Sequence, residues 1–310
     1  MVSVRWNKSS SLACALCFVW ATPPLAAQLV APGDELFFRA YSRSDPITKW
    51  PLKRMRHQIP ELKGLEPATD QRQLPRVLRG VGENLQKFVE NFVNTTSLEA
   101  IEETVKGGKP RKVERVEKFR YMMLARPQAN NFGLIEYRTD LQGRAIPPEK
   151  VDTKFMKTAG FAAMPLFFAP LQQSWSEFRH LGEQTVDGYS TQVVAFAEHV
   201  WPVAVGGRFV ERGESIPLLH QGVAWIRSSD YQILQMRTDL RAPVPPLTRM
   251  TTRVRYANNH FEGAPIAFWL PQEVQVTANV DRYVFTNRHT YSDYQLFRVE
   301  SVVKPAPAEK

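Results

Sequence analysis

Two cysteines and six histidines are the residues of this chain best suited to redox or metal chemistry, and their spacing forms no complete site. Cys14 and Cys17 have the C-x-x-C spacing of redox and zinc sites, but they lie in a short apolar run without a second pair. The histidines stand singly, without the spacing of zinc ligands: His57, His180, His199, His220, His260 and His289. We therefore predict no metal site and no cofactor.

Catalytic motifs are also missing from the sequence, which contains no G-x-S-x-G, H-E-x-x-H, Walker or G-x-G-x-x-G pattern. Glu198 stands next to His199, a pair able to exchange protons. Asp293 is similarly near His289. Such pairs are common by chance and need further groups around them to act as catalysts. We expect a protein that is not an enzyme.

The first 27 residues have the order of a cleavable secretory signal peptide. Arg5 and Lys8 give a positive start, residues 11–21 are apolar, and the segment ends in small residues at Ala27. The apolar part is shorter than the roughly 20 residues that span a bilayer. We predict cleavage after Ala27, which removes both cysteines and leaves an exported protein without a permanent membrane span.

The composition describes a basic protein with enough apolar residues for a substantial core. Of 310 residues, 43% are hydrophobic, and the net charge of +9 becomes +7 without Arg5 and Lys8. In an exported protein this charge favours anionic lipid headgroups or other acidic envelope polymers. Solubility is the simpler explanation, because the sequence has no dense Lys/Arg block. The absence of any nucleic-acid-binding motif argues against DNA or RNA.

The mature chain divides into three parts. Residues 28–73 are mixed in composition and interrupted by five prolines, which predicts an irregular or partly disordered N-terminal arm. Residues 74–303 form a single β-rich domain, and residues 304–310 form a disordered tail with two prolines and alternating charge.

One helix is expected over residues 75–94, beginning at Pro75, which suits a first helical turn. Gly80 and Gly82 weaken its first half but permit another element to approach closely. Its apolar residues recur in steps of three and four and form one stripe that must pack against an apolar surface: Val77, Leu78, Val81, Leu85, Phe88, Val89, Phe92 and Val93.

After this helix the hydrophobic period changes from helical to two. Apolar and polar residues alternate in 118–123, 250–256 and 273–280, which indicates strands with one polar face. Turn signals separate the runs, for example Asp187-Gly188. The sequence therefore predicts successive hairpins in a meandering, mostly antiparallel sheet.

Residues 160–171 (GFAAMPLFFAPL) interrupt this pattern with twelve uncharged residues. Two prolines favour short helical pieces lying across the sheet. The segment either fills the core or lines an apolar ligand cavity as a lid. In the second case the candidate lining residues are Phe161, Met164, Phe167 and Phe168, together with Trp225 from a strand.

Four pieces of the sequence, in order, resemble the outer-membrane lipoprotein-sorting protein superfamily (LolA-like), and in particular its uncharacterised exported bacterial members. They are LIEYRTDLQGRA at 134–145, FRHLGEQTVDGYSTQVVAF at 178–196, GVAWIRSSDYQILQMRTDL at 222–240 and TTRVRYANNHFEGAPIAFWLPQEVQV at 251–276. The likeness extends over about residues 88–299. It implies an α+β fold: a large, strongly curved antiparallel sheet, or half-barrel, with an N-terminal amphipathic helix and short helices over the concave face.

The resemblance also implies a location in the periplasm and a role without catalysis. One hypothesis is that the half-barrel binds an apolar ligand, a lipid or an acyl chain. The alternative is a structural or adaptor module of the cell envelope, whose sheet is filled by its own side chains and whose surface binds a protein partner.

Overall fold

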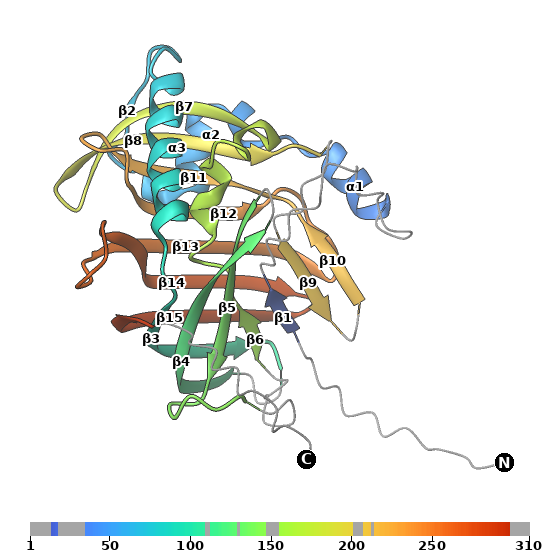
Figure 1. Cartoon of the computed structure of the whole chain (residues 1–310). Helices are drawn as coiled ribbons and strands as arrows, with labels where there is room; N and C mark the ends of the chain where they lie inside the picture. The colour runs from blue at the N-terminus through green and yellow to red at the C-terminus, as the bar shows by residue number, and fades with distance from the viewer. Residues whose placement is uncertain are drawn as a thin grey trace, which may run out of the picture.

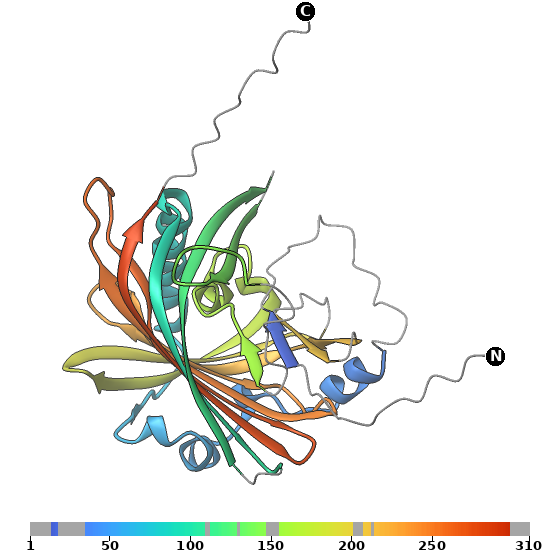
Figure 2. The ribbon, with the colours of Figure 1, turned by 90° about the horizontal axis from the view of Figure 1, so that it is seen from below.

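A computed structural model of the chain describes residues 14–17, 35–108, 112–128, 131–146, 155–200, 207–211 and 214–297. Within these ranges eleven strands form one large sheet, and every neighbouring pair is antiparallel (Figure 1). The sheet is strongly curved and ends at β2 on one edge and β5 on the other, so these strands do not close into a barrel (Figure 2). The predicted half-barrel fold is confirmed.

The strands of the main sheet follow the order β2-β7-β8-β11-β12-β13-β14-β15-β3-β4-β5. Hairpins join most neighbours, as the turn signals predict; Asp187 and Gly188, both at positive φ, form the turn between β7 and β8. The strands are β2 Glu66–Pro67, β3 Thr95–Lys106, β4 Lys112–Gln128, β5 Asn131–Thr139, β7 Ser176–Val186, β8 Tyr189–Glu198, β11 His220–Arg227, β12 Ile233–Leu240, β13 Leu247–Asn259, β14 Phe268–Val280 and β15 Tyr283–Leu296.

A second sheet of four strands has the order β10-β9-β1-β6. Its strands are β1 Cys14–Cys17, β6 Met156–Thr158, β9 Gly207–Glu211 and β10 Glu214–Leu218. β1 lies within the predicted signal peptide, whose other residues are outside the described ranges, as is the predicted tail at 304–310.

Helix α3, Leu74–Asn91, lies across the concave face of the main sheet (Figure 1). It corresponds to the helix predicted over 75–94 and has Pro75 in its first turn. Val77 and Val81, on its apolar stripe, are buried in the main core, and Leu85 and Phe88 are partly buried against it. No helix in the described ranges is long and apolar enough to cross a membrane.

Next to α3, the 3-10 helices η4, Met164–Phe168, and η5, Gln173–Trp175, cover more of the concave face. η4 is a short helical piece of the kind predicted for residues 160–171, and η5 follows that segment. Phe167 lies against Phe196 of β8 with ring centroids 5.1 Å apart, and Phe168 lies 5.5 Å from the same ring. The main hydrophobic core is thus formed between the curved sheet, α3 and η4.

A second hydrophobic core lies on the convex side of β7, β8 and β11. It is covered by the N-terminal arm, which forms α1 Glu35–Ser42, η1 Ile47–Lys49, α2 Leu52–Gln58 and η2 Pro60–Leu62 before β2 pairs with β7. Met55, Ile59 and Leu62 of the arm pack with Val223 and Trp225 of β11. From residue 35 the arm consists largely of these short helices, and residues 47–65 form an ordered cover (Figure 2).

Candidate functional site

A cavity of about 370 Å³ opens at one end of the concave face. Helix α3 and the segment that includes η4 form part of its wall. The rest comes from the sheet: the turn that joins β11 to β12, strand β13, and the residues leading into β14. Most of its lining is apolar: Val81, Leu85, Phe88, Ala162, Pro165, Leu166, Ile233, Ile266, Ala267 and Trp269, with Tyr231 and Tyr256. Such a volume lies at the lower end of the range typical of small-molecule sites.

The turn between β11 and β12 is attached closely to α3. Tyr231, at φ +59°, places its ring over Gly80, where an added Cβ would lie 2.2 Å from the ring. Arg76 Nε donates to Tyr231 Oη at 2.8 Å, and Asn84 Nδ2 donates to the carbonyl of Asp230 at 2.5 Å. The element that approaches α3 closely at Gly80 is therefore the turn between β11 and β12, which also forms one wall of the cavity.

Replacing Gly80 with alanine is expected to lower the free energy of unfolding by about 1–3 kcal/mol, because the new methyl group overlaps the Tyr231 ring. Alanine is the better helix former by about 1 kcal/mol, so a purely helical effect would have the opposite sign. Gly82→Ala is the milder comparison, since its Cβ would lie 3.1 Å from Pro170 and 3.2 Å from Gln173 Nε2, so that a smaller movement makes room for it. Urea denaturation of both variants measures the difference, and a stabilised Gly80→Ala would contradict the packing.

Charged groups lie at the rim of the cavity, not in its interior. Lys87 is exposed, and Arg227 forms an ion pair with Asp230. The guanidinium of Arg227 also lies over the Trp269 ring, 4.9 Å from its centroid. The hydrogen bond to Asp230 raises the pKa of Arg227 above its ordinary value. The rim thus combines fixed charge with an aromatic surface, while the interior is apolar.

The η4 segment beneath the cavity is fixed at both ends. At its start, the carboxylate of Glu136 on β5 accepts from the backbone N–H groups of Gly160 at 2.6 Å and Ala162 at 3.0 Å. At its end, Gln173 Nε2 donates to the carbonyls of Phe168 at 2.8 Å and Leu78 of α3 at 2.9 Å. The segment is therefore tied to both the sheet and the helix.

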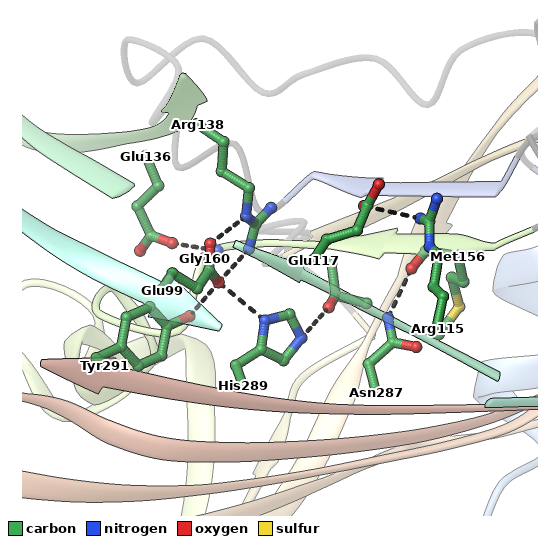
Figure 3. Close-up of polar contacts among 11 residues, drawn as sticks. Glu99, Arg115, Glu117, Glu136, Arg138, Met156, Gly160, Asn287, His289 and Tyr291 are labelled. Carbon is green, nitrogen blue, oxygen red and sulfur yellow. Dashed lines mark hydrogen bonds and ion pairs between the residues drawn. The ribbon is translucent and has the colours of Figure 1, made fainter. Parts of the chain in front are cut away.

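A buried charge network lies behind this segment (Figure 3). Glu99 of β3 is fully buried and receives a two-pronged hydrogen bond from Arg138 of β5, with Nη2 at 2.7 Å from Oε1. His289 Nδ1 and Tyr291 Oη of β15 each lie 2.9 Å from the same carboxylate. The other ring nitrogen of His289 contacts Thr158 Oγ1 at 2.9 Å. The network thus joins β3, β5, β6 and β15.

Burial and pairing act in opposite directions on the acids of this region. Burial by itself would raise the pKa of Glu99, but Arg138 and then His289 outweigh it and hold the pKa at about 2. Burial raises the pKa of Glu136 above its ordinary value, since its hydrogen bonds offset only part of the lost hydration. Burial also lowers the pKa of His289. Glu99 is therefore a permanent anion whose counterion is Arg138.

Comparison of the whole fold with solved structures finds proteins of similar architecture. A putative outer membrane lipoprotein-sorting protein domain from Vibrio parahaemolyticus matches with a TM-score of 0.40 and 11% identity over 72% of this chain and 92% of its own. A DUF1329 family protein from Desulfovibrio piger matches with a TM-score of 0.41 and 11% identity over 73% and 94%. A LolA superfamily protein from Nitrosomonas europaea matches with a TM-score of 0.30 and 13% identity over the same shares.

Two of these descriptions name the superfamily that the four sequence pieces resemble. No protein-family model matches the chain, and no curated protein matches it. At these TM-scores the likeness concerns general architecture, and the function is argued from the residues of this chain.

Four of the candidate lining residues lie together, but not around the cavity. Phe161, Met164, Phe167 and Phe168 are buried in the main core, where they fill the concave side themselves. Their neighbours Ala162, Pro165 and Leu166 line the cavity instead. The side chains alternate along the segment between sheet and cavity.

Trp225, the fifth candidate, lies on the other side of the sheet. It is buried beneath the N-terminal arm, and its Nε1 donates to Gln184 at 2.9 Å. The reason is strand parity: in β11, Ala224 and Ile226 face the concave core, so Trp225 faces the convex one. It does not face the cavity, which corrects its place among the lining candidates.

Glu198 and His289 have buried hydrogen-bond partners other than their sequence neighbours His199 and Asp293. Glu198 accepts from the backbone N–H of His220 at 2.6 Å and lies 3.1 Å from its Nδ1, whereas His289 pairs with Glu99 and not Asp293. Both pairs are buried and neither lines the cavity. Within the described ranges no group of three or more His, Cys, Asp or Glu is placed to hold a metal ion.

Proposed function

We propose that this protein is exported to the periplasm and there binds a single-chain lipid or acyl chain, without catalysis, in the cavity between α3, η4 and β12–β14. The observation that carries the proposal is the 370 Å³ cavity itself, with its apolar interior and charged rim. Each methylene buried there contributes about 0.8 kcal/mol, so ten methylenes contribute about 8 kcal/mol without any catalytic group.

The size of the cavity favours one chain over several. A volume of 370 Å³ is close to the lower limit for drug-sized ligands, and the rest of the concave face is filled by Phe161, Phe167 and Phe168. Lys87 and the paired Arg227 at the rim suit an anionic head group, such as a carboxylate, that remains in contact with water. The proposed ligand is therefore a fatty acid or a similar single-chain amphiphile.

The decisive experiment compares Leu85→Glu with Gln86→Glu on α3. Leu85 lines the cavity, whereas Gln86 is exposed on the other face and bonds Glu90 at 2.9 Å. A fluorescent fatty acid titrated into the purified wild type should give saturable binding, and Leu85→Glu should weaken it about 100-fold because the apolar wall then carries a charge. Gln86→Glu should bind as the wild type does.

Solvent extraction of the purified protein, followed by mass spectrometry, tests the same proposal without a chosen probe. A single-chain lipid recovered from the wild type but not from Leu85→Glu supports it. If the wild type neither carries lipid nor binds the fluorescent fatty acid, or if both variants bind equally, the cavity is not a lipid site.

The adaptor hypothesis is favoured by one separate observation, exposed apolar side chains at one end of the sheet. Leu98 of β3 and Ile135 and Tyr137 of β5 are each 38–40% exposed, and β5 is an edge strand of the sheet. Exposed apolar side chains beside an open edge suit a protein partner. Cross-linking in the cell envelope tests this: Ile135→Glu should abolish the cross-linked product, and recovery of this protein alone would exclude the adaptor role.

A further inference from the structure

The part of the N-terminal arm that covers the second core carries several exposed cations. Three apolar residues of the arm, Met55, Ile59 and Leu62, point into the second core and are at most 1% exposed. Around them, within residues 49–63, five of the exposed residues are Lys or Arg. We call them the basic arm surface: Lys49, Lys53, Arg54, Arg56 and Lys63. In the sequence apolar residues stand among them, and folding buries Met55, Ile59 and Leu62 while all five cations stay exposed.

The negative charges in this stretch do not cancel the cations on the basic arm surface. Residues 43–65 contain six Lys or Arg and two acids, a net charge of +4 within the +7 of the mature chain. Glu61 is paired with Arg237 at 2.9 Å and with Arg253, both of which belong to the sheet. Asp45 pairs with Arg54 at 2.9 Å, and Glu66 and Glu183 lie beside Lys63 at one end of the segment. More than half of the net charge is therefore concentrated on one short segment.

An aromatic residue stands among these cations. Trp50 is half-buried between η1 and α2, and the guanidinium of Arg54 stacks on it at 3.8 Å from the ring centroid. Tryptophan is enriched where proteins meet the interface between lipid and water, since its ring has an apolar body and a polar edge.

We propose that the basic arm surface docks the protein on an anionic lipid bilayer. The cations are spread over η1, α2 and the residues after η2, and they do not converge on a single pocket. Three of the five are lysines, which act as point charges without the fixed fork of arginine. This arrangement suits many mobile phosphate head groups, whereas an acidic peptide would need a groove that orders its side chains. Juxtamembrane basic clusters bind anionic lipids in the same way.

The proposed docking is independent of the lipid cavity, because the arm covers the convex side of the sheet while the cavity opens beside α3 on the concave side (Figure 2). Loss of one activity therefore leaves the other measurable.

The experiment uses the purified mature protein and sedimentation with two kinds of vesicle, phosphatidylcholine alone and phosphatidylcholine mixed with phosphatidylglycerol. The triple variant Lys49→Gln, Lys53→Gln and Lys63→Gln removes three exposed ammonium groups that form no ion pair or hydrogen bond within the described ranges, and it keeps the backbone hydrogen bonds of Lys49 and Lys63, so the fold should be kept. We expect the wild type to bind the phosphatidylglycerol vesicles alone, and to be released at about 1 M salt, where the screening length is about 3 Å.

The triple variant should bind about 100-fold more weakly, since each lysine near an anionic surface contributes about fivefold. The charge-matched control removes Lys106, Lys112 and Lys118 of the β3–β4 hairpin, which are also exposed and of which Lys112 pairs with Glu114; it should bind as the wild type does. Equal losses in both triple variants would show that total charge is responsible and would overturn the assignment to the arm. If the wild-type protein does not bind phosphatidylglycerol vesicles at low salt, the proposal of membrane docking is wrong.

Discussion

Replacing Arg138 with methionine is expected to lower the free energy of unfolding by about 3–5 kcal/mol at neutral pH. The substitution keeps the bulk of the side chain but leaves the fully buried Glu99 without the cation that neutralises it. His289 is too weak a replacement, because burial lowers its pKa and favours the neutral ring. Urea denaturation followed by tryptophan fluorescence measures the loss.

The same pair predicts how the difference depends on pH. The pKa of Glu99 is 4.5 in the unfolded chain and about 2 in the folded one, so its contribution is complete above pH 4.5 and is lost as the pH falls toward 2. This shift corresponds to about 3 kcal/mol. Without Arg138, burial raises the pKa of Glu99, so the contribution of this carboxylate to folding stability is missing even at neutral pH. The stability difference between the wild type and Arg138→Met should therefore shrink across this range.

Two further variants make this test specific. The double variant Glu99→Gln with Arg138→Met should regain part of the loss, because no buried charge remains. Arg120→Met, on the neighbouring strand β4, should change stability by no more than about 0.5 kcal/mol, because Arg120 is one of the half-exposed residues of that strand. A loss below about 1 kcal/mol for Arg138→Met, or one that does not vary with pH, would contradict the buried pair.

Replacing Trp225 with alanine is expected to cost about 3–5 kcal/mol of folding stability and to leave ligand binding unchanged. Its ring is 1% exposed in the core beneath the arm, and its removal also deprives Gln184 of a donor. Thermal unfolding and a fatty-acid titration, performed on the same preparation, measure the two properties.

Trp269→Ala is the counterpart of this variant, since Trp269 is half-exposed and lines the cavity. It should lose less stability and more ligand affinity than Trp225→Ala. If Trp225→Ala instead weakened binding at unchanged stability, the separation of the molecule into a concave and a convex core would be wrong.

Local periodicity was sufficient to predict most of the main sheet and its principal helix. The apolar steps of three and four in 75–94 correspond to α3, and the period of two in 118–123, 250–256 and 273–280 corresponds to β4, β13 and β14. These patterns are reliable because a helix or strand with one buried face repeats that face along its own sequence.

The second core was missed, although the sequence contains a signal for it. Val193 to Ala197 of β8 and Val223 to Ile226 of β11 are continuous apolar runs. In a strand with one solvent-exposed face, apolar and polar residues alternate, whereas a continuous apolar run indicates burial on both faces. These runs predict a cover on the convex side, and the arm at residues 47–65 supplies it.

The sequence predicted which segments form the cavity, but not which of their side chains line it. The pattern of residues 160–171 and that of the helix indicated these two segments, and both form walls of the cavity. Which side chains face the cavity depends on how η4 is rotated, and that is set by Glu136 holding the N–H groups of Gly160 and Ala162. The aromatic residues of this segment turn toward the sheet, so Ala162, Pro165 and Leu166 remain for the cavity.

By itself, the sequence determined the antiparallel strands and the amphipathic helix, because both follow from contacts that repeat every two to four residues. The curvature of the sheet and the place of the helix over it were implied by the family resemblance and not by the periodicity. Tertiary structure alone decided the buried Glu99 network, whose members His289 and Arg138 lie 190 and 39 residues away along the chain. It also decided which face of Trp225 is covered and which cations become neighbours on the arm. Pairings over such distances have no period, since they depend on how whole strands are placed beside one another.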